Sequence, residues 1–188
     1  SGGAADGAIT VTTTNGGHIV LHGGGRQYSH AQIGHGGRSS VSGLQTGTIT
    51  VTSAGKVELK GSVYADTGVS SGASNETFAQ IGHGGMFAPG TFGGAIDVSA
   101  QTGVLLESGA SYYARAHIGH GGYQAGTDAG ATVEMANAAV TVRTATGGVI
   151  LDASKATLGY ATAMIGNGGT GTAAVGTRSG AFRGDIVV

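Results

Sequence analysis

Apolar and polar residues alternate in short stretches along this chain, and the stretches recur in a fixed order. Residues 7–11 read GAITV, which alternates with the period of two that is typical of a half-buried strand. Residues 18–22, HIVLH, alternate in the same way, and residues 31–37, AQIGHGG, give a third short strand that ends at two glycines. The pattern predicts three strands followed by a polar loop over residues 38–46.

This order of strands returns along the whole length, so the sequence predicts a repeat protein. Residues 66–77 are interpreted as an insertion within the second repeat, and the strand pattern is kept on both sides of it. A solenoid accommodates such insertions as bulges between stacked turns. The expected repeats cover approximately residues 1–46, 47–93, 94–137 and 138–183, with the start of a fifth at 184–188.

Stacking the repeats aligns their apolar residues in columns, two for each strand. The third strands, for example, align Ile33, Ile81, Ile118 and Ile165. Three inward faces per turn predict an all-β fold, a parallel β-helix with about three short strands per turn and four turns plus one strand, in a single array over residues 1–188. The general preference for right-handed parallel crossovers predicts a right-handed helix, with rungs ~4.8 Å apart.

Composition agrees with a packed solenoid and excludes several other classes. Glycine is frequent, at 40 of 188 residues, but the single proline excludes collagen. The apolar residues make up 39% and lie at regular places, which argues against a disordered linker. Cysteine is absent, so disulfides and thiolate metal sites are impossible.

Charge and hydropathy exclude two kinds of partner. The chain has 9 basic and 10 acidic residues and no basic run, so we expect no nucleic-acid binding. Its apolar runs are far shorter than the ~20 residues that a membrane-spanning helix needs, so we expect no membrane insertion. The chain begins at Ser1 without a signal-peptide pattern, which is expected after processing or in a segment of a longer protein.

The third strand carries the most distinctive residues. Its motif, AQIGHGG in the first two repeats, becomes AHIGHGG at residues 116–122 and AMIGNGG at residues 163–169. The repeats therefore place three histidines and one asparagine in one column, with successive members ~5 Å apart. The column consists of His35, His83, His120 and Asn167.

Two interpretations of this column are open. Stacked imidazoles could bind Zn²⁺, Cu²⁺ or Ni²⁺, which makes His35, His83 and His120 weak candidates for a metal site. Neutral His or Asn at a glycine corner could instead hydrogen-bond to exposed backbone groups or to a stacked neighbour. Because Asn167 is a poor ligand for these metals, we expect a structural ladder in which these residues back onto the isoleucine column, and no cofactor.

Other candidate sites are weaker. Tyr28, Tyr113 and Tyr160 each lie three residues before the motif, and Tyr64 is a candidate fourth member displaced by the insertion. Such a column could present a sugar-binding platform, but we expect it to stabilise the stack. The acidic residues are scattered, whereas polysaccharide-degrading β-helices need a carboxylate pair or basic residues in a groove, so we expect no enzyme and no catalytic residues.

The order GxIxV, GxVxL and AQIGHGG resembles repeats of the filamentous-haemagglutinin-like exoproteins, very large secreted adhesins of Gram-negative bacteria. The resemblance covers essentially the whole chain. It implies a long β-helical rod outside the cell or at its surface. It also implies export through an outer-membrane partner, although the N-terminal secretion domain that this partner recognises is not apparent here.

The expected function follows from the fold and from this resemblance. We expect a structural segment of a filament or adhesin stalk whose uncapped ends stack on adjacent repeats or on identical subunits. The segment would belong either to one long chain or to a head-to-tail polymer. A carbohydrate- or receptor-binding module, with a host or surface glycan as its partner, is the alternative, and a polysaccharide-degrading enzyme is less favoured.

Overall fold

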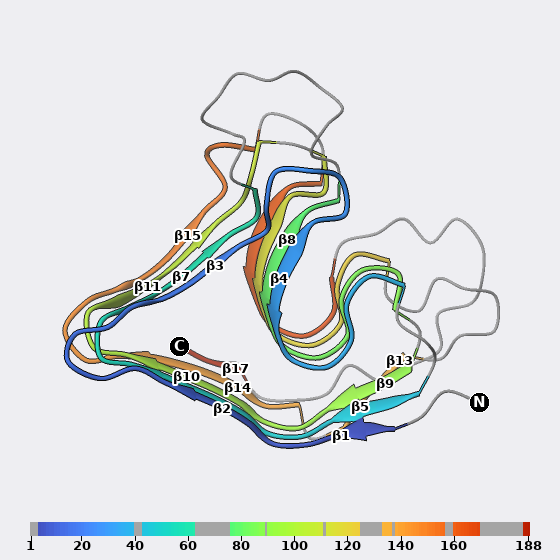
Figure 1. Ribbon diagram of the computed structural model, residues 1–188, viewed down its shortest axis with the longest axis horizontal. Coiled ribbons are helices and arrows are strands. Elements are labelled where there is room, and N and C mark those ends of the chain that lie inside the picture. Colours follow the sequence, from blue (N-terminus) through green and yellow to red (C-terminus); the bar gives the residue numbers. More distant parts are fainter. Residues whose placement is uncertain are drawn as a thin grey trace.

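The computed structural model describes most of the chain and confirms an all-β parallel β-helix of about four turns. In the described residues there is no helix, and hence none long and apolar enough to cross a membrane. Its strands stack in register along one axis (Figure 1). The right-handed sense stays a prediction. The described residues are 4–39, 43–62, 76–88, 90–110, 112–124, 133–136, 138–156, 160–169 and 186–188.

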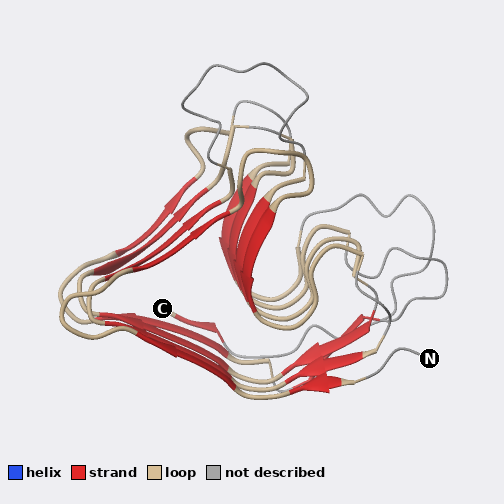
Figure 2. Cartoon of the chain, viewed as in Figure 1, coloured by secondary structure: helices blue, strands red, loops and turns tan. Residues whose placement is uncertain are grey.

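Three of the sheets are those that the alternating pattern predicts (Figures 1 and 2). The first sheet contains β2 (Ile9–Thr12), β6 (Ile49–Ser53), β10 (Ile96–Ala100), β14 (Val140–Thr144) and β17 (Ile186–Val187). The second contains β3 (Ile19–His22), β7 (Lys56–Lys60), β11 (Gly103–Glu107) and β15 (Val149–Asp152). The third contains β4 (His30–Ile33), β8 (Phe78–Ile81), β12 (Arg115–Ile118) and β16 (Thr162–Ile165).

The inward residues of these three sheets form the main core. Sheet pairing aligns Ile49 with Ile96, Leu59 with Leu106 and Ile81 with Ile118, as the columns predict. All of these side chains are buried in one apolar cluster. The inward columns therefore stack as continuous apolar ribs along the rod, with a side chain from every turn.

A fourth sheet lies in segments for which the sequence predicted no strand. It contains β1 (Ala5–Asp6), β5 (Leu44–Thr46), β9 (Gly90–Gly93) and β13 (Val133–Ala136). The chain leaves the third sheet in a U-shaped turn, drawn in tan in Figure 2, and returns through this sheet to the first sheet. Phe92 is buried there in a second cluster with Ala88 and Ala138, so the added strand has a small core of its own.

The polar loop expected over residues 38–46 is therefore wrong at its end, because residues 44–46 are β5. Gln45 pairs in register with Phe92 of β9, so a polar and an aromatic residue share one column. Neighbouring repeats thus have no common apolar pattern here, which explains why the sequence did not reveal the strand. The single proline, Pro89, lies outside the described residues.

Candidate functional site

The motif ends in a turn that brings the chain out of the third sheet. The first glycine of each turn lies directly against the next rung: a Cβ on Gly82 would be 1.9 Å from the carbonyl oxygen of Gly119. The equivalent positions in the turns before and after are also glycine, at 34 and 119, and meet the same kind of carbonyl. Only glycine allows the backbones to stack this closely. The residue after this glycine, His83 in the second repeat, then places its side chain near the start of the first sheet.

His83 makes two hydrogen bonds with the backbone, one from each ring nitrogen. Its Nδ1 accepts from the main-chain N–H of His35 at 3.0 Å, and its Nε2 lies 2.9 Å from the carbonyl oxygen of Gly47. Because Nδ1 accepts a hydrogen bond, it carries no proton, so Nε2 carries the proton and donates to Gly47. The backbone partners thus fix a neutral ring in a single tautomer.

The arrangement repeats along the rod. The N–H of His83 donates to Nδ1 of His120 at 3.1 Å, and Nε2 of His120 donates to Gly94 at 2.9 Å. In the next turn Oδ1 of Asn167 accepts from the N–H of His120, while its Nδ2 donates to the carbonyl of Ala138. The asparagine amide therefore supplies the same acceptor and donor as a Nε2-protonated imidazole.

These bonds connect the chain in two directions. The carbonyl acceptors Gly7, Gly47, Gly94 and Ala138 each lie two residues before a strand of the first sheet, so each side chain closes its own turn. The N–H donors belong to the preceding turn, so the same side chain also links neighbouring turns. The rings add stacking, with centroids 4.9 Å apart for the first pair of histidines and 5.0 Å for the second. We call this set, His35, His83, His120 and Asn167, the histidine ladder.

Burial favours the neutral form of His83 and His120, the two inner histidines of the ladder. Desolvation lowers the pKa of His83, and it lowers the pKa of His120 from 6.5 to about 4. A metal ion on either ring would have to displace a backbone hydrogen bond, since both nitrogens of His83 and His120 are engaged. Within the described ranges no group of three or more His, Asp or Glu side chains could hold a metal ion.

A second ladder of polar side chains lies on the face of the third sheet that points away from the isoleucine core. Nε2 of Gln80 donates to the carbonyls of Gly119 at 3.0 Å and Gly121 at 2.9 Å in the next turn. Gln32 makes the equivalent bonds one turn earlier, and His117 lies 2.7 Å from the carbonyl of Gly166 one turn later. Burial lowers the pKa of His117 to about 3. The sequence reasoning missed this ladder, although the recurrence of Gln in the motif was a signal for it.

The tyrosine column is present, with one change of member. Tyr64 lies outside the described residues, and Glu76 occupies the position three residues before the motif in the second repeat. Tyr113 and Tyr160 stack with centroids 5.1 Å apart, and the guanidinium of Arg38 lies 3.6 Å from the ring centroid of Tyr28. The Tyr113–Tyr160 stack and the Arg38 contact therefore each cover a ring face that a sugar would need.

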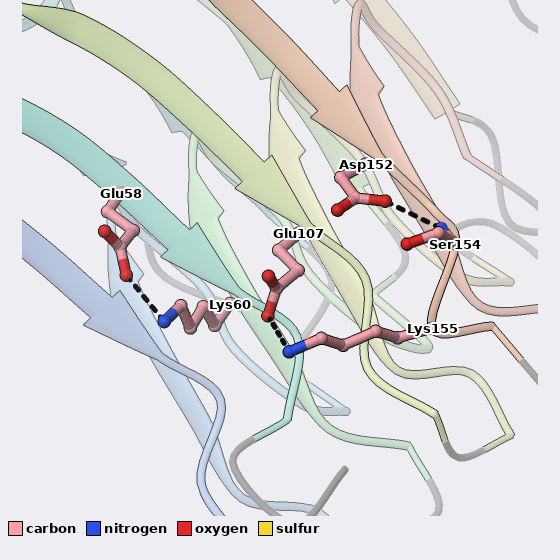
Figure 3. A network of polar contacts seen from close by, with 6 residues as sticks. All are labelled: Glu58, Lys60, Glu107, Asp152, Ser154 and Lys155. Carbon is pink, nitrogen blue, oxygen red and sulfur yellow. Dashed lines mark hydrogen bonds and ion pairs between the residues drawn. The ribbon is translucent and has the colours of Figure 1, made fainter. Parts of the chain in front are cut away.

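The outer face of the second sheet carries charged side chains in local pairs (Figure 3). Lys60 and Glu107 are register neighbours of opposite charge, but each forms its ion pair with another residue. Nζ of Lys60 lies 2.8 Å from Glu58, and Glu107 is 3.2 Å from Lys155. The hydrogen bond between Lys60 and Glu58 lowers the pKa of Glu58 and raises that of Lys60. Because these pairs lie at the surface and are partly exposed to solvent, each contributes at most ~1 kcal/mol to stability.

The fold and the ladder together define a class: a parallel β-helix whose turns are closed by stacked His and Asn side chains, of which His83 and His120 are fully buried. Comparison with known proteins adds no relative to this class. No protein-family model, curated protein or solved structure matches the chain.

Proposed function

We propose that this chain is a structural segment of a secreted or cell-surface bacterial filament or adhesin stalk. In this role further β-helix turns stack on its axial ends, either from the same longer chain or from identical subunits. Its repeats are suited to stacking, because successive turns place equivalent strands and equivalent ladder residues against one another.

The observation that carries this proposal is the exposure of a core column at the last full turn. Leu59 and Leu106 of the second sheet are 0% exposed, whereas Leu151, their equivalent on β15, is 48% exposed. Among the described strands β15 is the edge of its sheet, and an apolar core residue at such an edge favours covering by another turn. An added turn would bury the leucine and pair the edge of β15.

The charged side chains support a structural role over an enzymatic one. Glu58, Glu107 and Asp97 each pair with a Lys or Arg, and Asp152 accepts from the N–H of Ser154. Carboxylates held in this way do not form the facing pair that glycoside hydrolysis requires. The stacked tyrosines likewise give the carbohydrate-binding alternative no specific support, because their ring faces contact one another. The resemblance to filamentous-haemagglutinin-like repeats supports the extracellular location.

Axial stacking can be tested with a pair of neighbouring substitutions. Leu151→Lys places a charge on the exposed core at the end of the rod, while Ile150→Lys places one on the outer face of the same strand, where Ile150 is 57% exposed. We expect sedimentation velocity and electron microscopy to show rods one β-helix wide for the wild type and Ile150→Lys, and monomers for Leu151→Lys. A wild type that stays monomeric up to millimolar concentration would contradict stacking of identical subunits and leave continuation within one longer chain as the only form of the proposal.

A further inference from the structure

Arg115 is a buried arginine that neither the histidine ladder nor axial stacking uses. It lies on β12, next in register to Phe78, and only 2% of it is exposed. Its guanidinium lies over the Phe78 ring, 5.6 Å from the centroid, and a Cβ on Gly122 would come within 3.2 Å of Nη2. The charged group is therefore enclosed between the third sheet and the turn that follows it.

Two nitrogens of this guanidinium, Nε and Nη2, have no hydrogen-bond partner in the part of the chain that the structure describes. Among the described residues Arg115 also makes no ion pair. Burial lowers its pKa to about 10, so the group remains protonated at neutral pH. An uncompensated buried charge is strongly destabilising, so a counter-charge is needed at this position.

The two unpaired groups also suggest the shape of that counter-charge. The N–H of Nε and one N–H of Nη2 leave the same edge of a guanidinium in parallel, and this edge binds carboxylate or phosphate through two oxygens. Two acceptors on the same face of the sheet, Nδ1 of His117 and Oε1 of Gln80, also lack a partner among the described residues. They could accept hydrogen bonds from a bridging water.

We propose that Arg115 binds an oxyanion between β12 and the turn at residues 119–124. Nε–H and Nη2–H each donate to one oxygen, and the anion neutralises the buried charge. Its chemical class is a carboxylate, phosphate or sulfate, because each offers two oxygens at the spacing of the guanidinium edge. The site concerns the stability of one turn and is independent of axial stacking.

Thermal unfolding at constant ionic strength tests the site with phosphate and with formate, each against chloride. Arg115→Met removes the guanidinium, and Arg143→Met, at an exposed arginine paired with Asp97, controls for general salt effects. In the wild type and Arg143→Met we expect Tm to rise by about 3–6 °C for each tenfold increase in the free anion concentration above the dissociation constant. Arg115→Met should lack this increment. Equal responses of all three proteins to both anions would overturn the proposal.

Nuclear magnetic resonance of the arginine Nε–H groups gives a second, direct readout. The Arg115 signal is assigned by its loss in Arg115→Lys, and it should shift saturably with phosphate or formate but not with chloride. Absence of a saturable shift would overturn the proposal. So would a shift of this signal, in anion-free buffer, on replacing an acidic residue whose side chain lies outside the described part. Those replacements are Asp66→Asn, Asp128→Asn, Glu134→Gln and Asp185→Asn.

Discussion

The main-chain N–H of His83 donates a hydrogen bond to Nδ1 of His120, 3.1 Å away, while the two rings stack with centroids 5.0 Å apart. The other nitrogen of His120 closes its own turn at Gly94. One side chain therefore satisfies a backbone donor in the preceding turn and a backbone acceptor in its own. A protonated ring could not accept the first of these bonds, so the ladder depends on neutral histidine.

Two replacements of His120 distinguish the contribution of its hydrogen bonds to stability from that of its ring stacking. His120→Asn keeps an acceptor and a donor, as Asn167 does, and loses mainly stacking, so we expect the free energy of unfolding to fall by about 1–2 kcal/mol. His120→Leu leaves the N–H of His83 and the carbonyl of Gly94 unpaired, so we expect a loss of about 2–5 kcal/mol. Urea unfolding followed by circular dichroism measures both. If asparagine cost as much as leucine, the hydrogen bonds would not be the source of stability.

Stability should decrease in mild acid. The pKa values of His120 and His117 are about 4 and about 3 in the folded protein and near 6.5 when unfolded, so the unfolded state binds more protons below pH 6.5. Stability is fully present above pH 6.5 and is lost as the pH falls toward the folded values. Between pH 6.5 and 4.5 we expect a loss of up to about 1.4 kcal/mol per pH unit for each residue.

The matched control for this pH dependence removes the titrating groups and keeps their hydrogen bonds. His120→Asn follows the residue at position 167, and His117→Gln follows Gln80, its register partner. The double variant should lose most of the slope in plots of urea midpoint against pH. A wild-type midpoint that is constant from pH 6.5 to 4.5 would show that the buried histidines do not control acid stability.

The close approach of the turns predicts very different costs for two glycine substitutions. Gly82→Ala would place its Cβ 1.9 Å from the carbonyl oxygen of Gly119, and since backbone cannot yield cheaply, we expect a loss above about 4 kcal/mol or failure to fold. At Gly148 a Cβ would meet nothing within 4 Å, and alanine should be neutral or stabilising by up to about 1 kcal/mol. Thermal unfolding compares them, and similar Tm values would contradict the stacking geometry.

Much of the fold could be predicted because the inward positions recur in every repeat. Ile33, Ile81, Ile118 and Ile165 pair in register, as the sequence columns indicate. The fourth sheet could not be predicted, because Gln45 and Phe92 share a column without sharing hydrophobicity. Its strands follow from the path of the U-shaped turn, which local alternation does not specify.

The ladder could be predicted only in part. Motif spacing brings His35, His83 and His120 together, and the asparagine in the fourth copy favours hydrogen bonding over metal binding. Which ring nitrogen donates and which accepts could not be predicted without the path of the chain. The acceptors are backbone carbonyls at the start of each histidine's own turn, Gly47 for His83 and Gly94 for His120. Arg115 gave no sequence signal, since its column contains His30, Phe78 and Thr162, which share no chemistry.

The ring ¹⁵N chemical shifts of His83 and His120 at neutral pH, with and without Zn²⁺, test the ladder most directly. Both Nε2 atoms should have shifts of protonated nitrogen and both Nδ1 atoms shifts of an unprotonated acceptor, with no change on adding Zn²⁺. The triple variant His35→Asn, His83→Asn and His120→Asn should also keep the fold. Protonated Nδ1 atoms, or Zn²⁺-dependent shifts of these rings, would contradict a structural ladder and restore the metal-binding interpretation.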